Sequence, residues 1–154
     1  MLKYINVTGG VVDPLSVPLS KRKEGELKVF TQARKFVAHT IHICSNEKVF
    51  PKRYRWCITN KIVDTSISMI QHIDLANAFR LDDPPSARLR LNYQNQALAE
   101  TFALLTLMNL ARDAFGIPGP KMLYWTGLLV PIQDLIRGWK RSDKNRIEKQ
   151  TNKQ

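Results

Sequence analysis

The side chains in this sequence that could carry chemistry are mainly cations, and they are unevenly spaced along the chain. The sequence holds 24 Lys and Arg against 13 Asp and Glu, which gives a formal net charge of +11. An excess of this size is typical of proteins that bind a polyanion, such as nucleic acid, an anionic membrane surface or an acidic protein. A charge that serves only solubility is the alternative.

Two groups of basic residues are the candidate nucleic-acid-binding residues. The first basic group follows Pro51 and comprises Lys52, Arg53, Arg55 and Lys61. The second basic group lies near residue 140 and comprises Arg137, Lys140, Arg141, Lys144 and Arg146. Each phosphate that such cations neutralise strengthens binding and steepens its dependence on salt. Because cations also suit helix C-termini, part of the second group has a purely structural explanation.

Aromatic residues lie among both groups. Tyr54 and Trp56 belong to the first stretch, and Trp139 belongs to the second. Aromatic rings beside cations can stack on unpaired bases, but they are also common anchors of a hydrophobic core. The sequence leaves both interpretations open. A third run of cations, 21–23 with Lys28, precedes the first helical pattern.

Few residues suggest catalysis. His39 and His42 are three apart and could share a helical face, but no partner motif for a metal site accompanies them. Asp82 and Asp83 could bind a divalent ion, yet a charge-balancing, helix-capping turn is the favoured interpretation. The segment 116–120 contains two prolines, which cannot supply the backbone N–H groups of a phosphate loop. We therefore expect no enzyme activity, no metal site and no cofactor.

Cysteine usage and hydropathy favour an intracellular protein. Cys44 and Cys57 fit neither a metal spacing nor a disulfide framework, so two buried reduced thiols are expected. No signal peptide is recognisable at the start, and no apolar run reaches the roughly 20 residues that a membrane span needs. We expect a soluble, cytoplasmic protein with no membrane partner.

Four amphipathic segments must position these residues. Apolar residues spaced three and four apart predict helices over 26–45, 52–79, 87–115 and from about 121 onward. Pro51 suits the start of the second helix. Ser86 suits the N-cap of the third helix, and Gly116 suits the end of that helix. Four such helices with short connections predict an all-α, antiparallel up-down-up-down four-helix bundle. The first and second basic groups would then lie at opposite ends of the bundle.

Each predicted helix has a predicted buried stripe. In the first helix the stripe is Phe30, Ala33, Val37, Ile41 and Cys44. In the second it is Ile58, Ile62, Met69, Ile73 and Ala76, flanked by an apolar arc wide enough for two neighbours. The third centres on Leu91, Leu98 and Leu105, and the fourth on Trp125, Leu128, Leu129, Ile132, Leu135, Ile136 and Trp139. Pro131 predicts a kink in the fourth helix, with Gly127 relieving the clash of its ring.

The domain organisation follows from these elements. Residues 1–25 show no helical period and are interpreted as an extended arm, although 4–5 and 11–12 could instead pair as strands. Residues 26–142 form the bundle domain. Residues 143–154 are a basic polar tail, for which helical extension and disorder both stay open.

Three segments resemble a known family. The family is the small four-helix-bundle family that includes the ribosomal RNA intervening-sequence proteins. Its first helix resembles residues 27–37, its second helix resembles 50–56 with 60–62, and its last helix resembles 132–140. Within it, 74–79 and 138–140 are most similar to the Avd family, the accessory variability determinants of diversity-generating retroelements. The resemblance covers about 26–142.

The resemblance implies a function. Avd-like proteins are non-catalytic, basic, barrel-shaped homopentamers that associate with a reverse transcriptase and with its template RNA during mutagenic cDNA synthesis. The resemblance implies the same homo-oligomer and the same partners for this chain, with the two basic groups contacting template RNA and cDNA. The alternative is an RNA- or protein-interaction module of the intervening-sequence type with no polymerase partner. A metal-dependent RNA-processing enzyme using Asp82 and Asp83, and a membrane-surface protein, are weaker alternatives.

Overall fold

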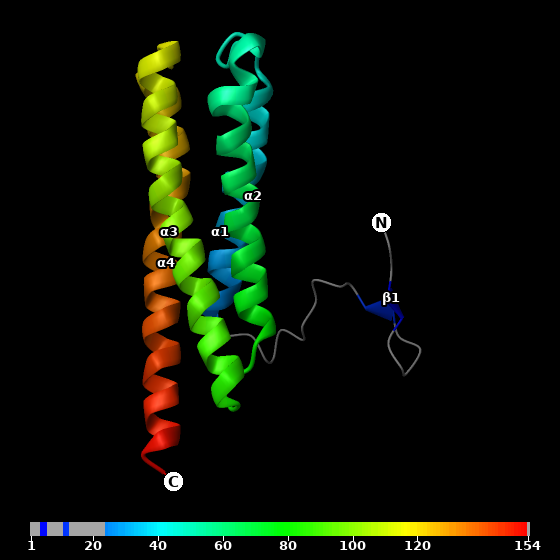
Figure 1. Cartoon of the computed structure of the whole chain (residues 1–154), viewed down its shortest axis with the longest axis vertical. Helices are drawn as coiled ribbons and strands as arrows, with labels where there is room; N and C mark the ends of the chain where they lie inside the picture. Colours follow the sequence, from blue (N-terminus) through cyan, green and yellow to red (C-terminus); the bar gives the residue numbers. More distant parts are fainter. Residues whose placement is uncertain (1–3, 6–10, 13–23, 154) are drawn as a thin grey trace.

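Four long helices make up most of the chain. The computed structural model describes residues 4–5, 11–12 and 24–153. Its helices are α1 (Glu24–Ser45), α2 (Asn60–Ala78), α3 (Pro84–Phe115) and α4 (Gly119–Thr151). Helix α1 packs against α2 and α4, and α3 packs against the same two helices, so the four surround a common core (Figure 1). The prediction of an all-helical four-helix bundle is confirmed.

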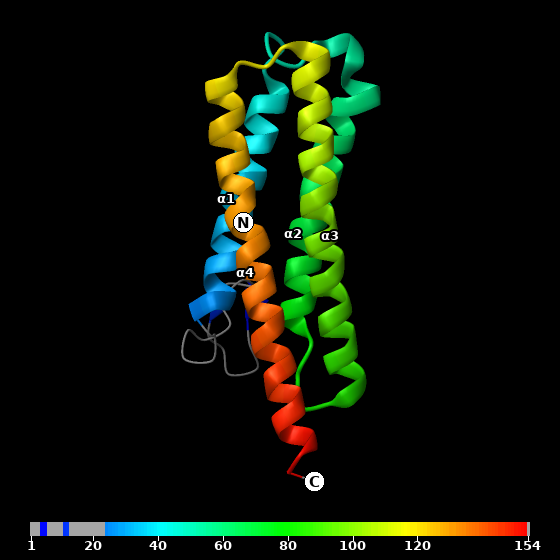
Figure 2. The ribbon, with the colours of Figure 1, turned by 90° about the vertical axis from the view of Figure 1, so that its left-hand side faces the viewer.

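The connections between helices lie at the two ends of the molecule. Figure 2 shows the end of α1, the start of α2 and the α3–α4 connection together at one end. The α2–α3 connection lies at the other end, beyond which α4 extends to the C-terminus. The first and second basic groups are therefore distributed toward different ends of the bundle.

The N-terminal segment contains a short strand pair. Strands β1 (Tyr4–Ile5) and β2 (Val11–Val12) pair antiparallel, with Tyr4 opposite Val12 and Ile5 opposite Val11. The preferred prediction of an extended arm is wrong for these four residues, because their backbones satisfy each other as strands. The rest of the predicted arm up to residue 23, including the cations 21–23, lies outside the described residues.

The predicted second helix is not a single α-helix. Residues Lys52–Tyr54 form a 3-10 turn, Arg55–Thr59 form a π-helix, and α2 begins at Asn60. Tyr54 leaves helical geometry, with φ −106° and ψ 8°, which separates the two turns. Arg55 lies seven residues before Ile62, and in a continuous α-helix this spacing would place Arg55 on the buried line of α2. The extra residue in the π turn moves Arg55 off that line.

Helix α3 differs from the sequence prediction at its start and agrees with it at its end. Helix α3 starts three residues early, and Asp83 caps it by accepting a hydrogen bond from the backbone N–H of Ser86 at 3.0 Å. Pro84 is tolerated in the first turn because its missing N–H has no partner there. Gly116 ends α3 with φ +65°, a left-handed conformation that favours glycine, as predicted.

The buried stripes of α2 and α4 match the sequence pattern. Ile62, Met69, Ile73 and Ala76 are buried on α2, and six of the seven predicted residues are buried on α4. Helix α4 continues through Pro131 without a break. A Cβ added at Gly127 would meet no atom within 4 Å, and the proposed relief of the Pro131 ring clash at that position stays a prediction.

The stripes of α1 and α3 differ from the prediction. Ile41 is exposed, and Thr40 is buried in its place because its hydroxyl accepts a hydrogen bond from Trp125 Nε1 at 2.9 Å. On α3 the predicted leucines flank the core, whose central line includes three polar residues. That line is Ala87, Arg90, Gln94, Ala97, Thr101, Leu104, Met108 and Ala111. Hydrophobicity alone misplaces such stripes, since a polar side chain with an internal partner can be buried.

Candidate nucleic-acid interface

The first basic group surrounds the start of α2. Lys52, Arg53 and Lys61 are exposed, and within the described part of the chain none of the three has an acidic partner. Arg55 is different, since its guanidinium forms an ion pair with Glu47 at 3.3 Å. Three of the four predicted residues are therefore available to an external anion, and Arg55 is partly neutralised.

The aromatic residues of the two groups have opposite environments. Trp139 is 5% exposed and packs in the core, with the Arg90 guanidinium 5.0 Å from its ring centroid. Trp56 is 76% exposed on the π turn. Tyr54 is also exposed, at 37%, with the Arg53 guanidinium 4.9 Å from its ring centroid and the Phe115 ring 5.6 Å away in a tilted arrangement. The core-anchor interpretation holds for Trp139 and is wrong for Trp56.

The second basic group divides between two faces of α4. Arg137, Arg141 and Lys144 are spaced four and three apart, so they share one exposed face of the helix. Arg146 lies on a different face and approaches the Asp143 carboxylate at 3.8 Å. Arg137 also pairs with Asp134 at 3.1 Å and lies 5.5 Å from the ring centroid of Phe102 on α3. The structure therefore unites three of the five predicted residues and separates Arg146; Lys140 is half-buried.

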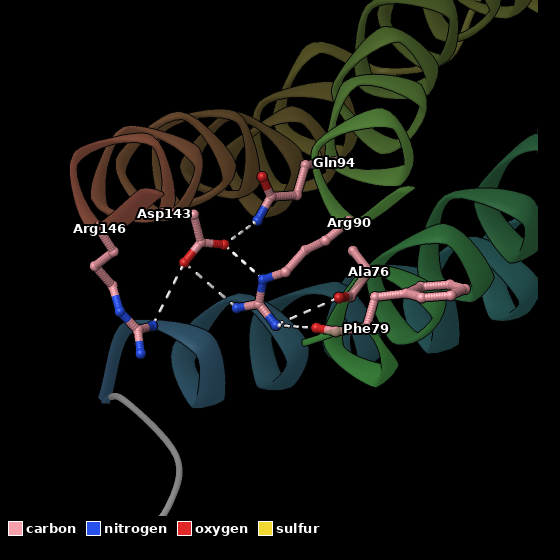
Figure 3. Close-up of polar contacts among 6 residues, drawn as sticks. All are labelled: Ala76, Phe79, Arg90, Gln94, Asp143 and Arg146. Carbon is pink, nitrogen blue, oxygen red and sulfur yellow. Dashed lines mark hydrogen bonds and ion pairs between the residues drawn. The ribbon is translucent and has the colours of Figure 1, made fainter. Parts of the chain in front are cut away.

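A buried ionic network lies beside this second group, and sequence reasoning missed it. Arg90 on α3 donates through Nε to the Asp143 carboxylate on α4 at 2.7 Å, and Gln94 Nε2 donates to the same oxygen at 2.7 Å (Figure 3). Arg90 also donates to the backbone carbonyl of Phe79 at 3.2 Å, at the end of α2. Asp143 is 0% exposed. Its position at a buried spacing from Trp139 was the only signal in the sequence.

This network joins three helices near the end of the bundle. It links the C-terminal turn of α2, the first turns of α3 and the C-terminal half of α4 (Figure 3). The predicted boundary at residue 142 falls inside α4, which runs to Thr151. Of the two alternatives for the tail, helical extension is the one observed. The second basic group is thereby held on a helix that is fixed at Asp143.

The two carboxylates considered for metal binding, Asp82 and Asp83, have other partners, and so does His72. Asp82 forms two hydrogen bonds with the Arg80 guanidinium, which hold the pKa of that carboxyl below its usual value, and Asp83 caps α3. The His72 ring contacts the Glu100 carboxylate at 2.9 Å across α2 and α3. Within residues 4–5, 11–12 and 24–153, no group of three His, Cys, Asp or Glu side chains could hold a metal ion.

Burial shifts the pKa of two further titratable groups. Burial raises the pKa of the Cys44 thiol to about 12, so this cysteine is a protonated core residue at neutral pH. Burial, with a smaller effect of His42, lowers the pKa of His39. His39 packs edge-on against Tyr124 at 4.9 Å, beside a cavity of about 360 Å³ that Lys121 and Asn46 also line. Cys44 and Cys57 are both free thiols, but only Cys44 is buried as predicted, whereas Cys57 is half-buried.

One face of the α3–α4 pair lacks charge. The sequence has no charged residue between Met122 and Gln133, and only Glu100 between Leu91 and Ala111. Leu123, Val130 and Arg137 are seven apart on α4, and Arg137 contacts Phe102, which places this side of α4 next to α3. Four large apolar residues are exposed here: Leu123 and Val130 on α4, and Phe102 and Leu110 on α3. We call these four residues the apolar face.

Comparisons with protein-family models, with curated proteins and with solved structures find no match. Within the described part of the chain, none of the helices combines the length and the apolar character required to cross a bilayer.

Proposed function

We propose that this chain is an Avd-like accessory protein of a diversity-generating retroelement. In this proposal it is cytoplasmic and has no catalytic activity. It binds the reverse transcriptase, and its basic groups bind template RNA and cDNA to support mutagenic cDNA synthesis. The observation that carries the proposal is the pair of exposed cationic surfaces, Lys52, Arg53 and Lys61 at one end and Arg137, Arg141 and Lys144 toward the other.

Electrostatics favours a polyanion over other partners. A net charge of +11 on 154 residues attracts phosphate at long range, and exposed cations without acidic partners keep that attraction at contact. Contacts to phosphate position a strand without reading its sequence. Specificity for the template would then come from the polymerase or from the RNA fold.

We further propose that the protomer, an antiparallel up-down-up-down bundle, assembles into a homo-oligomer, a pentamer by the family resemblance. The apolar face supports assembly, since exposed apolar patches commonly mark protein interfaces. Its occupant is a second copy of this chain, because a surface whose only cation is Arg137, beside Phe102, is the one on which copies carrying +11 each repel least.

Removing two cations tests the proposed RNA contact. The double variant Lys52→Gln with Arg53→Gln is expected to weaken binding to the template RNA and to reduce the slope of log affinity against log salt by about 1 to 2, since each lost phosphate contact removes about 0.7 to 0.9. Filter binding or fluorescence anisotropy across a salt series measures both. A variant with Arg34→Gln and Lys35→Gln removes equal charge from the exposed side of α1 and is the matched control.

The outcomes separate a site from a general charge effect. Equal loss in both variants, or an unchanged slope in the first, would contradict the proposed contact. Co-purification with the reverse transcriptase of the same element tests the second partner. RNA binding without such a complex would favour the interaction module of the intervening-sequence type.

A further inference from the structure

Trp56 is an exposed aromatic residue that lies within five residues of three exposed cations in the sequence. We propose that Trp56 is a base-stacking residue, so that the surface at the start of α2 takes single-stranded nucleic acid with an unpaired base on the indole. This inference rests on the proposed function and specifies its ligand. It concerns the Trp56 surface, made of Trp56, Lys52, Arg53 and Lys61.

Burial distinguishes Trp56 from the other two tryptophans. Trp125 is fully buried and Trp139 nearly so, whereas Trp56 is 76% exposed. Leaving an indole of this size in water forgoes the burial that stabilises the other two. Trp56 is outside the described core, so its indole is available for a contact at the surface.

The local backbone presents the indole outward. The π turn Arg55–Thr59 interrupts the helical phase before α2, and Thr59 is its buried residue. Trp56 therefore stays off the core line, while Ile58 and Ile62 continue the packing below it. The turn sits at the end of the bundle, where a strand can approach without contacting the long sides of the helices (Figure 2).

The charges around Trp56 suit a phosphate backbone. Lys52 and Arg53 precede it by four and three residues, and Lys61 follows in the first turn of α2. All three are exposed and have no acidic partner among the described residues. Single-strand binding surfaces combine such cations with an aromatic platform, because every base has a face that can stack. Duplex bases are already stacked and cannot reach the indole.

A protein partner is the competing occupant, since Trp and Arg are also common at protein interfaces. The charge favours nucleic acid. Three unpaired cations beside one indole would require a protein with a matching acidic pocket, whereas a nucleotide supplies a base and a phosphate together. The test below separates the two.

Intrinsic fluorescence reports directly on this site. Because Trp125 and Trp139 are buried, quenching by a single-stranded oligouridylate should come from Trp56 alone. Trp56→Ala is expected to abolish that quenching and to weaken oligouridylate binding by about 5- to 150-fold, with the salt slope unchanged. Binding to an RNA duplex of equal length should not change. Trp56→Phe should retain most of the affinity.

Control variants separate stacking from a general loss of apolar surface or of the fold. Leu89→Ala removes another exposed apolar side chain, on the first turns of α3, and should alter neither affinity. Far-UV circular dichroism checks that each variant folds. Salt-dependent binding without quenching, or equal loss on single strand and duplex, would overturn stacking while leaving the proposed function intact. Loss of reverse-transcriptase binding alone would assign Trp56 to a protein interface. A wild-type chain that binds no RNA would overturn both proposals.

Discussion

At the scale of single residues, the deciding feature is the Arg90–Asp143 pair. Both side chains are buried, and Asp143 accepts from Arg90 and from Gln94. A buried ion pair contributes little net stability, but removing one partner leaves an uncompensated charge in the core. The pair therefore acts as a condition on the fold, because α3 and α4 must align for either charge to be satisfied.

Removing the Asp143 carboxylate should be costly. We expect Asp143→Ala to lower the free energy of unfolding by about 3 to 5 kcal/mol, because the buried Arg90 guanidinium and the Gln94 amide both lose the carboxylate that accepts their hydrogen bonds. Urea denaturation followed by circular dichroism measures the change. Asp134→Ala breaks the surface ion pair between Asp134 and Arg137. Because the Asp134 side chain is 75% exposed, this change should lower the free energy of unfolding by less than about 1 kcal/mol. Similar losses in the two variants would show that the network contributes nothing beyond a surface pair.

At the scale of elements, α4 joins the parts of the molecule. Its first half carries Trp125, Leu128 and Leu129 in the core, and its second half carries Asp143 and the second basic group. The helix contains Pro131, Gly127 and Gly138, all residues with poor helix propensity. Packing against α1 and α3 therefore compensates for a weak intrinsic preference.

Gly138 offers a direct test of that balance. A Cβ built there meets no atom within 4 Å, so Gly138→Ala should raise the free energy of unfolding by about 0.5 to 1 kcal/mol through helix propensity. Thermal or urea unfolding measures the gain. Gly116→Ala is the contrasting variant, because φ +65° disfavours any side chain, and it should destabilise the protein by about 1 kcal/mol. Destabilisation by Gly138→Ala would reveal a contact at that surface.

At the scale of the whole molecule, the cationic surfaces and the apolar face cover different parts of the bundle and meet where Arg137 lies over the ring of Phe102. The cationic surfaces lie at the start of α2 and on the C-terminal half of α4, whereas the apolar face lies along α3 and the first half of α4. In the proposed assembly, this arrangement would let copies associate through the apolar face while the cationic surfaces stay open to phosphate.

Introducing charge on the apolar face should break the proposed oligomer. We expect Leu123→Glu with Val130→Glu to reduce the native mass to that of one chain, because each buried carboxylate would lose its solvation. Light scattering or native mass spectrometry measures the mass. Leu75→Glu, at an exposed apolar residue of α2, should leave the assembly unchanged. A wild-type chain that is monomeric at micromolar concentration would contradict the assembly.

Local patterns were sufficient for much of the fold. The spacing of apolar residues predicted four helices, the buried lines of α2 and α4, and the glycine end of α3, because these depend on the period of the helix and on backbone preference. The two basic groups were likewise visible as clusters in the chain.

Pairings between distant residues required the tertiary structure. No local rule predicts that Thr40 meets Trp125, or that Arg90 meets Asp143 across 53 residues, and these partners are what allow polar side chains into the core. The same packing decided that Trp139 is buried while Trp56 is exposed, although both lie among cations. Side-chain chemistry is set by the residue type, but its exposure is set by what the rest of the chain places against it.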